Sequence, residues 1–205
     1  MIKSLSFIII LFGLLFIGIG GYQFFKTQHT QSESIKKAQQ LLKQTDDLEK
    51  HTDDMKKHKP QKKADFKPKQ NDVVGILSIP QINAELPIVE GTDEDDLEKG
   101  VGHYKGTAYP MDNDQIVLSG HRDTVFRRMG ELRIGDILSL KLPYGTFSYE
   151  IKETKIVDVD DRSIIQSTAP EEVLTITTCY PFSYIGDAPY RYIITALPVQ
   201  HSSKQ

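Results

Sequence analysis

The sequence predicts an all-β domain, a barrel or a sandwich, that follows a transmembrane helix and a polar stalk. Three observations support this prediction. A long apolar run lies near the N-terminus, a Lys-rich segment of low hydrophobicity follows it, and the remainder alternates short β-prone runs with turn residues. We therefore divide the chain into an anchor (1–25), a stalk or linker (26–70), a folded domain (71–199) and a polar tail (200–205).

The anchor contains the run LSFIIILFGLLFIGIGGYQFF, residues 5–25. At about 1.5 Å per residue this run is long enough to cross a hydrocarbon core of roughly 30 Å. A cleaved secretory signal is the competing interpretation, but its apolar core is usually about 7 to 15 residues and small residues follow it. Here the bulky Tyr22 and Phe25 stand in those places, so we expect an uncleaved anchor. Charge does not decide its orientation, because Lys3 competes with Lys26 under the positive-inside rule.

The stalk is rich in Lys, Gln, Asp and Thr, a composition that buries too little apolar surface to pack. Its twelve lysines and seven acidic residues give a net charge of +5, whereas the folded domain has eleven basic and twenty-one acidic residues and a net charge of −10. Such a negative domain argues against nucleic-acid binding. We expect a solvated spacer with local helicity. A weak coiled coil is the alternative, because Leu41, Leu48 and Met55 recur at seven-residue intervals.

The folded domain contains seven β-prone runs that glycine and proline separate: 74–79, 86–89, 116–118, 137–142, 146–159, 173–178 and 190–197. Short strands at this regular spacing are typical of an all-β barrel or sandwich. One short helix is expected in TDEDDLEKG, residues 92–100. Thr92 would be its N-cap and Gly100 its stop.

The single cysteine, Cys179, is the candidate nucleophile. A lone cysteine more often packs as a small hydrophobe, and it excludes an internal disulfide and any multi-cysteine metal site. Its context changes that interpretation. The segment QIVLSGHRDT presents His121 at the exit of a strand, and Arg191 returns on the strand that follows the Cys179 loop. A cysteine and a histidine that are far apart in sequence, each at a strand end, are the pattern expected of a thiolate with an imidazole partner.

These residues resemble the sortases, the cysteine transpeptidases that attach proteins to Gram-positive cell walls. The resemblance rests on TITTC ending at Cys179, on SGH ending at His121, and on Arg191 in the next strand, and it covers 71–199 with GILSIPQINAELPIVEG and GVGHYKGTAYP. Spacing and the short anchor resemble the class D group of spore-forming bacilli and clostridia. The resemblance implies an eight-stranded sortase-type β-barrel with short helices, attached to the cell membrane by one span, with its catalytic domain on the extracellular face.

The resemblance also implies the roles of the three residues. Cys179 and His121 would act as a thiolate and imidazolium pair, His121 would protonate the leaving amine, and Arg191 would bind the oxyanion or the substrate backbone. The enzyme would cleave an LPxT-like sorting motif of an exported protein after its threonine, through a thioacyl-enzyme. It would then join the product to an amine of the peptidoglycan stem peptide or its lipid-linked precursor. A hydrolytic cysteine protease of the cell surface and a non-catalytic wall-surface adaptor are the alternatives.

Other residues receive expected roles around these three. His103, in GVGHYKGTAYP, is a second possible base on chemistry alone, but the family pattern assigns it to packing or hydrogen bonding. Thr178 would order the bound peptide through its hydroxyl, and Ser119 and Gly120 would line the groove floor. Strand-end packing is the alternative for these three. The loop between residues 159 and 173 is the expected selector, with three residues forming walls for the leucine and proline of the motif: Ile164, Ile165 and Ala169.

No cofactor and no metal ligand are expected. The acidic residues of 90–98 suggest calcium as an alternative, because calcium takes about six to eight oxygen ligands, and some class A sortases bind calcium near this region. These acids lack the spaced D-x-D-x-D-G loop, however. The dipole of a solvated helix N-terminus explains them.

Overall fold

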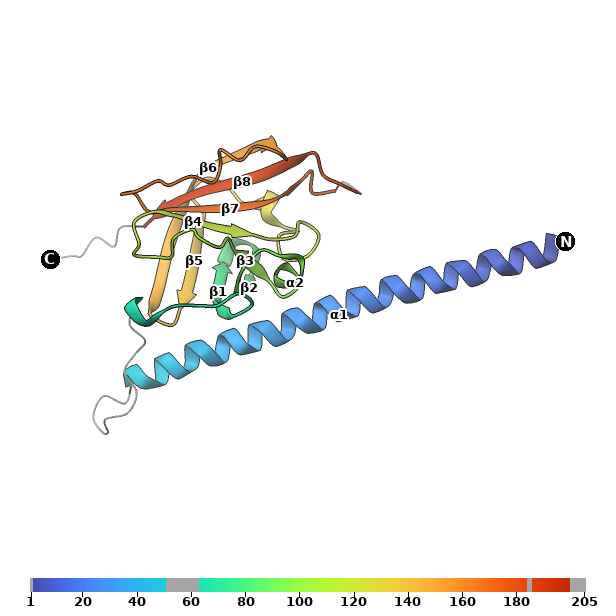
Figure 1. The fold of residues 1–205 in the computed structure, drawn as a ribbon, viewed down its shortest axis with the longest axis horizontal. Coiled ribbons are helices and arrows are strands. Elements are labelled where there is room, and N and C mark those ends of the chain that lie inside the picture. The colour runs from blue at the N-terminus through green and yellow to red at the C-terminus, as the bar shows by residue number, and fades with distance from the viewer. Residues whose placement is uncertain (1, 51–62, 184–185, 200–205) are drawn as a thin grey trace.

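The computed structural model describes residues 2–50, 63–183 and 186–199, and Figure 1 shows a β-barrel beside one long helix. The strands are β1 (Val73–Ile79), β2 (Ala84–Glu90), β3 (Val101–His103), β4 (Gln115–Ser119), β5 (Ile137–Leu142), β6 (Gly145–Asp158), β7 (Val173–Tyr180) and β8 (Tyr190–Pro198). They close in the order β1-β2-β3-β4-β7-β8-β6-β5. The helices are α1 (Ile2–Lys50) and α2 (Glu94–Leu97), with 3₁₀ turns η1 (Lys63–Asp65), η2 (Pro80–Ile82) and η3 (Met129–Glu131). The eight-stranded barrel with short helices is confirmed.

The seven strands predicted from residue patterns are all present, with ends that differ by no more than two residues. The strand without such a prediction is β3, which pairs in parallel with β2 and antiparallel with β4 and so closes the barrel. Close packing requires the central residue of β3, Gly102, to be glycine. A Cβ added to Gly102 would lie 2.4 Å from the carbonyl oxygen of Gly91.

The barrel interior is filled by apolar side chains from every wall. Strand β5 shows the alternation that a half-buried strand requires, with Leu138, Leu140 and Leu142 buried and their neighbours partly exposed. Leu174 and Ile176 of β7 are also buried, with exposed fractions of 0% and 1%. This packing fixes the part of β7 that precedes Cys179.

Helix α1 continues from the predicted anchor into the predicted stalk without a break. Its second half packs against β1 and β2, where it buries Ser34 and Ala38. Such small side chains let a helix approach its neighbours closely, so this part of the stalk is a docked helix and not the solvated spacer that we expected. Residues 51–62, with Met55 of the seven-residue repeat, lie outside the described residues, as does the tail 200–205.

Among the described residues, one helix is long and apolar enough to cross a membrane. An 18-residue window within Ile9–Lys43 has a mean hydropathy of 1.7, and none of it is buried. These properties match the predicted anchor in length and composition. Where the apolar run ends, Lys26 Nζ lies 3.0 Å from Glu98 Oε2, so an ion pair joins α1 to the segment that follows α2.

The helix predicted at 92–100 forms as α2, but its N-cap is Asp93 and not Thr92. The reason is the buried carboxylate of Asp96, whose Oδ2 accepts a hydrogen bond from the Asp93 backbone N–H at 3.2 Å. Thr92 is left outside the helix and lines a groove at the end of the barrel.

Candidate active site

The register of two parallel strands brings His121 and Cys179 to the same edge of the barrel. In the β4–β7 pair Ser119 lies opposite Thr177, and the Gly120 N–H donates to the Thr177 carbonyl at 3.3 Å. His121 and Cys179 each stand two residues beyond this paired position. Because both strands run in one direction, their carboxyl ends present the imidazole and the thiol at one level.

The neighbouring antiparallel strand adds the cation. Cys179 of β7 lies directly opposite Arg191 of β8. Residues opposite each other in such a pair share a face of the sheet, with Cβ atoms about 4.5 to 5.5 Å apart. The Arg191 guanidinium donates from Nη1 to the carbonyl oxygens of Tyr190 at 3.0 Å and Ala188 at 3.3 Å.

All three predicted catalytic residues line one groove of about 340 Å³. Five of the six predicted substrate-binding residues line it as well: Ser119, Gly120, Thr178, Ile164 and Ile165. Ala169 does not, and its side chain is exposed. The loop is held away from the groove there because Asp114 accepts hydrogen bonds from the Thr168 backbone N–H at 2.7 Å and from Ser167 Oγ at 3.0 Å.

Several groove residues were not named individually from the sequence, although some of them belong to the loop predicted as the selector. They include one residue before α2, one in it, one after β3 and three of the loop after β6: Thr92, Leu97, Tyr104, Val159, Asp161 and Arg162. The buried Gln115 holds this loop in place. Its Nε2 donates to the Ile164 carbonyl at 2.8 Å, and its Oε1 accepts from the Gln166 N–H at 2.9 Å. No spacing or motif in the sequence relates Gln115 to a loop some fifty residues later.

Two hydrogen-bonding side chains join the cysteine strand to the histidine turn. The buried Thr178 donates from Oγ1 to the Gly120 carbonyl at 2.7 Å. The guanidinium of Arg122 donates to the carbonyls of Pro181 at 3.2 Å and Gly186 at 2.8 Å, in the loop that follows Cys179. A hydroxyl has one proton to donate. While Thr178 holds Gly120, its hydroxyl therefore has only oxygen lone pairs to offer a further partner.

The thiol is half-buried and forms no disulfide. A cysteine that served only as a core hydrophobe would be expected to lie fully inside the barrel, as Leu174 and Ile176 do. Cys179 lines one groove together with His121 and Arg191, and a thiol, an imidazole and a guanidinium are the components of nucleophilic acyl transfer.

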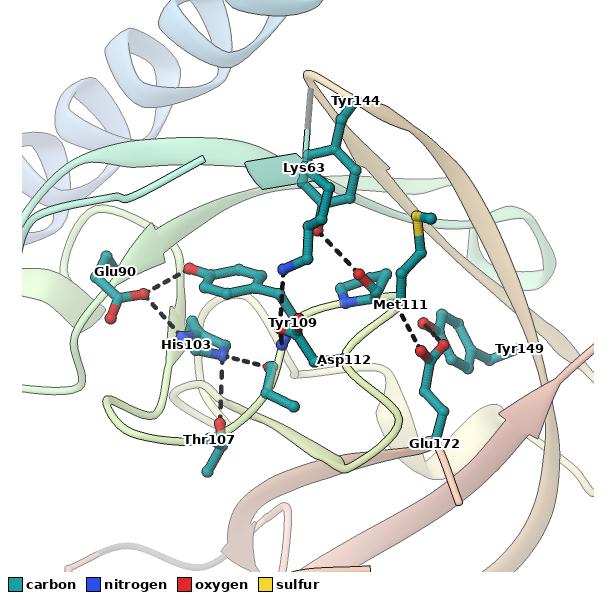
Figure 2. Close-up of polar contacts among 12 residues, drawn as sticks. Lys63, Glu90, His103, Thr107, Tyr109, Met111, Asp112, Tyr144, Tyr149 and Glu172 are labelled. Carbon is teal, nitrogen blue, oxygen red and sulfur yellow. Dashed lines mark hydrogen bonds and ion pairs between the residues drawn. The ribbon is translucent and has the colours of Figure 1, made fainter. Parts of the chain in front are cut away.

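His103 lies in a different environment, which Figure 2 shows. It is buried, with Nδ1 2.7 Å from Glu90 Oε2 and Nε2 2.9 Å from the Ala108 carbonyl oxygen, and its ring stacks on Tyr109. The Thr107 hydroxyl also lies 3.2 Å from Nε2, so both ring nitrogens have hydrogen-bond partners. His103 does not line the groove, in agreement with the packing and hydrogen-bonding role expected for it.

The carboxylate in this network is held in its charged form. Burial raises the pKa of Glu90, but the hydrogen bonds from His103 and Tyr109 outweigh burial and lower the pKa below its ordinary value. Burial and the hydrogen bond to Glu90 raise the pKa of Tyr109, so its hydroxyl stays a donor. These contacts join β2, β3 and the loop before β4.

No group of three or more His, Cys, Asp or Glu side chains is placed to hold a metal ion in the part of the chain that the structure describes. The acidic residues of 93–95 are exposed at the start of α2.

Comparison with known proteins agrees with this geometry. The sortase domain model matches residues 77–199. Sortase D of Bacillus subtilis (strain 168) is 55% identical over 192 residues, which cover 94% of this chain and 96% of that protein. Sortase A of Bacillus anthracis is 24% identical over 129 residues, or 61% of this chain and 59% of that protein.

Solved structures of sortases are also similar to this chain. The catalytic domain of SrtD from B. anthracis is 38% identical with a TM-score of 0.54, covering 73% of this chain and 97% of that one. A Sortase D5 transpeptidase from Clostridium perfringens has a TM-score of 0.65 at 23% identity, covering 84% of this chain and 99% of that one. At that identity the likeness concerns the fold alone.

Proposed function

The chain belongs to the sortase family of cysteine transpeptidases, and on that basis we propose that it cleaves an LPxT-like sorting motif after its threonine. The product is joined to an amine of the peptidoglycan stem peptide or of its lipid-linked precursor. The observation that supports this most directly is the groove that Cys179, His121 and Arg191 all line. An extended peptide laid along this groove would present its carbonyl to the thiol.

The first half of the proposed reaction is acyl transfer to sulfur. The Cys179 thiolate attacks the threonine carbonyl carbon, and the Arg191 guanidinium stabilises the oxyanion that forms. The C–N bond then breaks as the His121 imidazolium gives its proton to the leaving amine. A thioester with Cys179 and a neutral His121 remain.

In the second half, the acceptor amine attacks the thioester carbonyl and His121 takes a proton from it. The C–S bond breaks, which restores the thiolate and imidazolium pair and forms a new amide. Water in place of the amine would make the enzyme a hydrolase. The groove is open to solvent at Cys179, so the choice between amine and water rests on how well an amine is bound there.

The adaptor alternative requires Cys179 to be structural, and its partly exposed position in a groove is evidence against that.

Membrane attachment of the enzyme is part of the same proposal. We expect residues 1–25 to anchor the enzyme as a single span, with 71–199 as the catalytic barrel on the extracellular face. We also propose that the reaction needs no cofactor, because the thiol, imidazole and guanidinium supply nucleophile, acid and oxyanion partner.

A peptide-library assay on the full-length chain in lipid nanodiscs tests the proposal. LPxT-type peptides are incubated with and without diaminopimelate or oligoglycine, and products are identified by mass spectrometry. We expect an amine-linked product and a trapped thioester, both absent in Cys179→Ala and His121→Ala variants. Equal cleavage with and without amine would support the hydrolase, and full activity of the Cys179→Ala variant would refute the nucleophile. Activity unchanged by EDTA or added calcium would agree with a cofactor-free reaction.

A further inference from the structure

Tyr104 is the tyrosine that lines the groove containing Cys179. It directly follows β3, and its backbone N–H donates to the Val117 carbonyl at 2.9 Å, so it lies beside β4 at the level of Val117. Val117 pairs with Thr175 of β7, four residues before Cys179. Because a strand rises about 3.3 Å per residue, Tyr104 reaches the groove about 13 Å from the level of the thiol.

The loop after β6 borders the groove at the same level. Gln115 Nε2 donates to the Ile164 carbonyl at 2.8 Å and to Thr175 Oγ1 at 3.0 Å, so the backbone of Ile164 is held next to Thr175. Ile164 and Tyr104 both line the groove, one from this loop and one from the chain after β3. A peptide that lies extended along the groove, with one carbonyl at Cys179, therefore passes between them about three or four residues away.

The Tyr104 side chain is available to a ligand. Its exposed fraction is 37%, and its hydroxyl has no hydrogen-bond partner among the residues that the structure describes. Tyrosine at a binding surface commonly packs its ring on an apolar side chain while its hydroxyl bonds a polar group. An extended peptide with an apolar side chain offers a partner to each.

A buried network fixes the backbone at Tyr104. The Tyr104 carbonyl accepts hydrogen bonds from the Thr107 hydroxyl at 2.8 Å and from the Thr107 N–H at 3.1 Å. That hydroxyl oxygen also accepts from the Val117 N–H at 3.2 Å and lies 3.2 Å from His103 Nε2. Thr107 Oγ1 therefore joins the groove residue both to β4 and to the His103 ring.

The His103 ring is itself held from several sides (Figure 2). Nδ1 lies 2.7 Å from Glu90 Oε2, Nε2 lies 2.9 Å from the Ala108 carbonyl oxygen, and the ring stacks on Tyr109 with centroids 3.9 Å apart. Because neighbouring residues of an extended chain face opposite sides, His103 points into this network while Tyr104 faces the groove. A displaced ring would therefore shift the turn that fixes Tyr104.

We propose that His103 is a positioning residue of this enzyme, which acts from outside the groove by fixing Tyr104 against the bound peptide. This inference rests on the proposed function and deepens it. Tyr104 and Ile164 enclose the leucine of the LPxT-like motif, which precedes the attacked threonine by three residues, and His103 touches no substrate. Loss of His103 therefore weakens binding of the leucine and leaves the chemistry at Cys179 in place.

The first experiment is a double-mutant cycle with an LPxT peptide and the full-length chain in lipid nanodiscs. Tyr104→Ala should lower kcat/KM about tenfold through KM and change kcat less than about twofold, because the contact is the same in the bound peptide and in the transition state. His103→Ala should lower kcat/KM about fivefold, but less than about twofold in the Tyr104→Ala background, where nothing is left to position. Equal effects of His103→Ala in both backgrounds would overturn the inference.

Conservative variants separate positioning from folding. His103→Gln keeps an amide near the place of Nε2, facing Thr107, whereas His103→Asn keeps one near Nδ1, facing Glu90. His103→Gln should keep kcat/KM within about threefold of wild type, and His103→Asn should resemble His103→Ala. Values of kcat/KM that follow the urea midpoints of the variants instead would show a structural role alone. Should His103→Ala not fold, Thr107→Val, which removes the linking hydroxyl and keeps the shape of the side chain, takes its place in the cycle.

A further experiment needs no activity. The chain contains no tryptophan, so Tyr104→Trp in a Cys179→Ala background supplies a single emitter at the groove wall. The control is Ile134→Trp, at a position that is 67% exposed and does not line the groove. We expect an LPxT peptide to reduce acrylamide quenching at the groove position alone, and His103→Asn to increase it there alone. Quenching at the groove position that does not respond to His103→Asn would overturn the inference.

The outcomes separate the two claims. If the wild-type chain cleaves no LPxT peptide, the proposed function fails, while quenching still tests whether His103 fixes the position of Tyr104. If the wild-type chain cleaves the peptide and Tyr104→Ala leaves KM unchanged, the proposed function stands and the positioning role of His103 is refuted.

Discussion

The buried hydroxyl of Thr178 offers the sharpest test of how the site is held together. Its Oγ1 donates to the Gly120 carbonyl at 2.7 Å and is 3% exposed, so it joins β7, one residue before Cys179, to the turn that carries His121. Thr178→Val keeps the shape of the side chain and removes this hydrogen bond. Thr178→Ser keeps the hydroxyl and removes a methyl group.

The expected magnitude follows from this geometry. A neutral hydrogen bond contributes about 1 kcal/mol net, and a buried carbonyl left without a partner costs about 1 to 3 kcal/mol. Thr178→Val should therefore lower the free energy of unfolding by about 2 kcal/mol, or the melting temperature by roughly 6 °C for a domain of this size. Because a loss of about 1.4 kcal/mol in positioning is a tenfold rate effect, we expect kcat to fall about tenfold.

The assay combines urea unfolding with steady-state transpeptidation. Thr178→Val should lose both stability and kcat, while Thr178→Ser should lose some stability through its missing methyl group but keep a kcat within about threefold of wild type. The reasoning is refuted if Thr178→Val unfolds at the wild-type urea concentration, or if the valine and serine variants have the same kcat.

Two further predictions concern residues outside the proposed chemistry. Arg122→Met removes two charge-assisted hydrogen bonds to the loop after Cys179, so kcat should fall at least tenfold while Arg122→Lys recovers part of it; equal kcat values for wild type and Arg122→Met would contradict this role. The lowered pKa of Glu90 means that its carboxylate stabilises the fold at neutral pH and that this stability is lost as the pH falls through that lowered pKa. Between pH 3 and 7, the urea midpoint should fall less steeply with decreasing pH in Glu90→Gln than in wild type or in a Glu85→Gln control. The same dependence of the midpoint on pH in all three proteins would contradict the stabilising role of the Glu90 carboxylate.

Most of the barrel could be predicted because its strands alternate or concentrate apolar residues between glycine and proline. The exception is β3, since VGH is three residues long and needs Gly102 for close packing with the Gly91 carbonyl, whereas glycine is depleted in strands. Its neighbour α2 was placed correctly, but its N-cap was not. Whether Thr92 or Asp93 begins the helix depends on the buried carboxylate of Asp96.

The docking of α1 was not predicted, because the face that it turns to the barrel mixes residue types. Ser34 and Ala38 are buried there, and Ile35, Leu41 and Leu42 are half-buried. Hydrophobic periodicity detects a continuous apolar face, and small and polar residues interrupt this one. The residue pattern also does not show how the loop after β6 is held. Ile164 and Ile165 line the groove while Ala169 does not, because Gln115 and Asp114 hold the two parts of the loop in different places.

The three candidate catalytic residues could be proposed from the sequence because each lies at or near the end of a strand, and residue patterns locate strand ends. Their assignment to roles still rests on the family and on the groove. Nothing in the residue pattern distinguished His103 from His121 as a base. The network of His103 with Glu90 and the Ala108 carbonyl separates them, and it arises from the pairing of β2 with β3.

The parallel pairing of β4 with β7 also bears on how such enzymes diversify. The stretch of chain between these strands forms β5, β6 and the loop after β6, part of which lines the groove. The spacing of thiol and imidazole is nevertheless set by the pairing of Gln115–Ser119 with β7 and not by that stretch. A change of length in the loop after β6 would therefore leave the thiol and the imidazole aligned. On the proposed function, the peptide preference of the groove could then change while the reaction stayed the same.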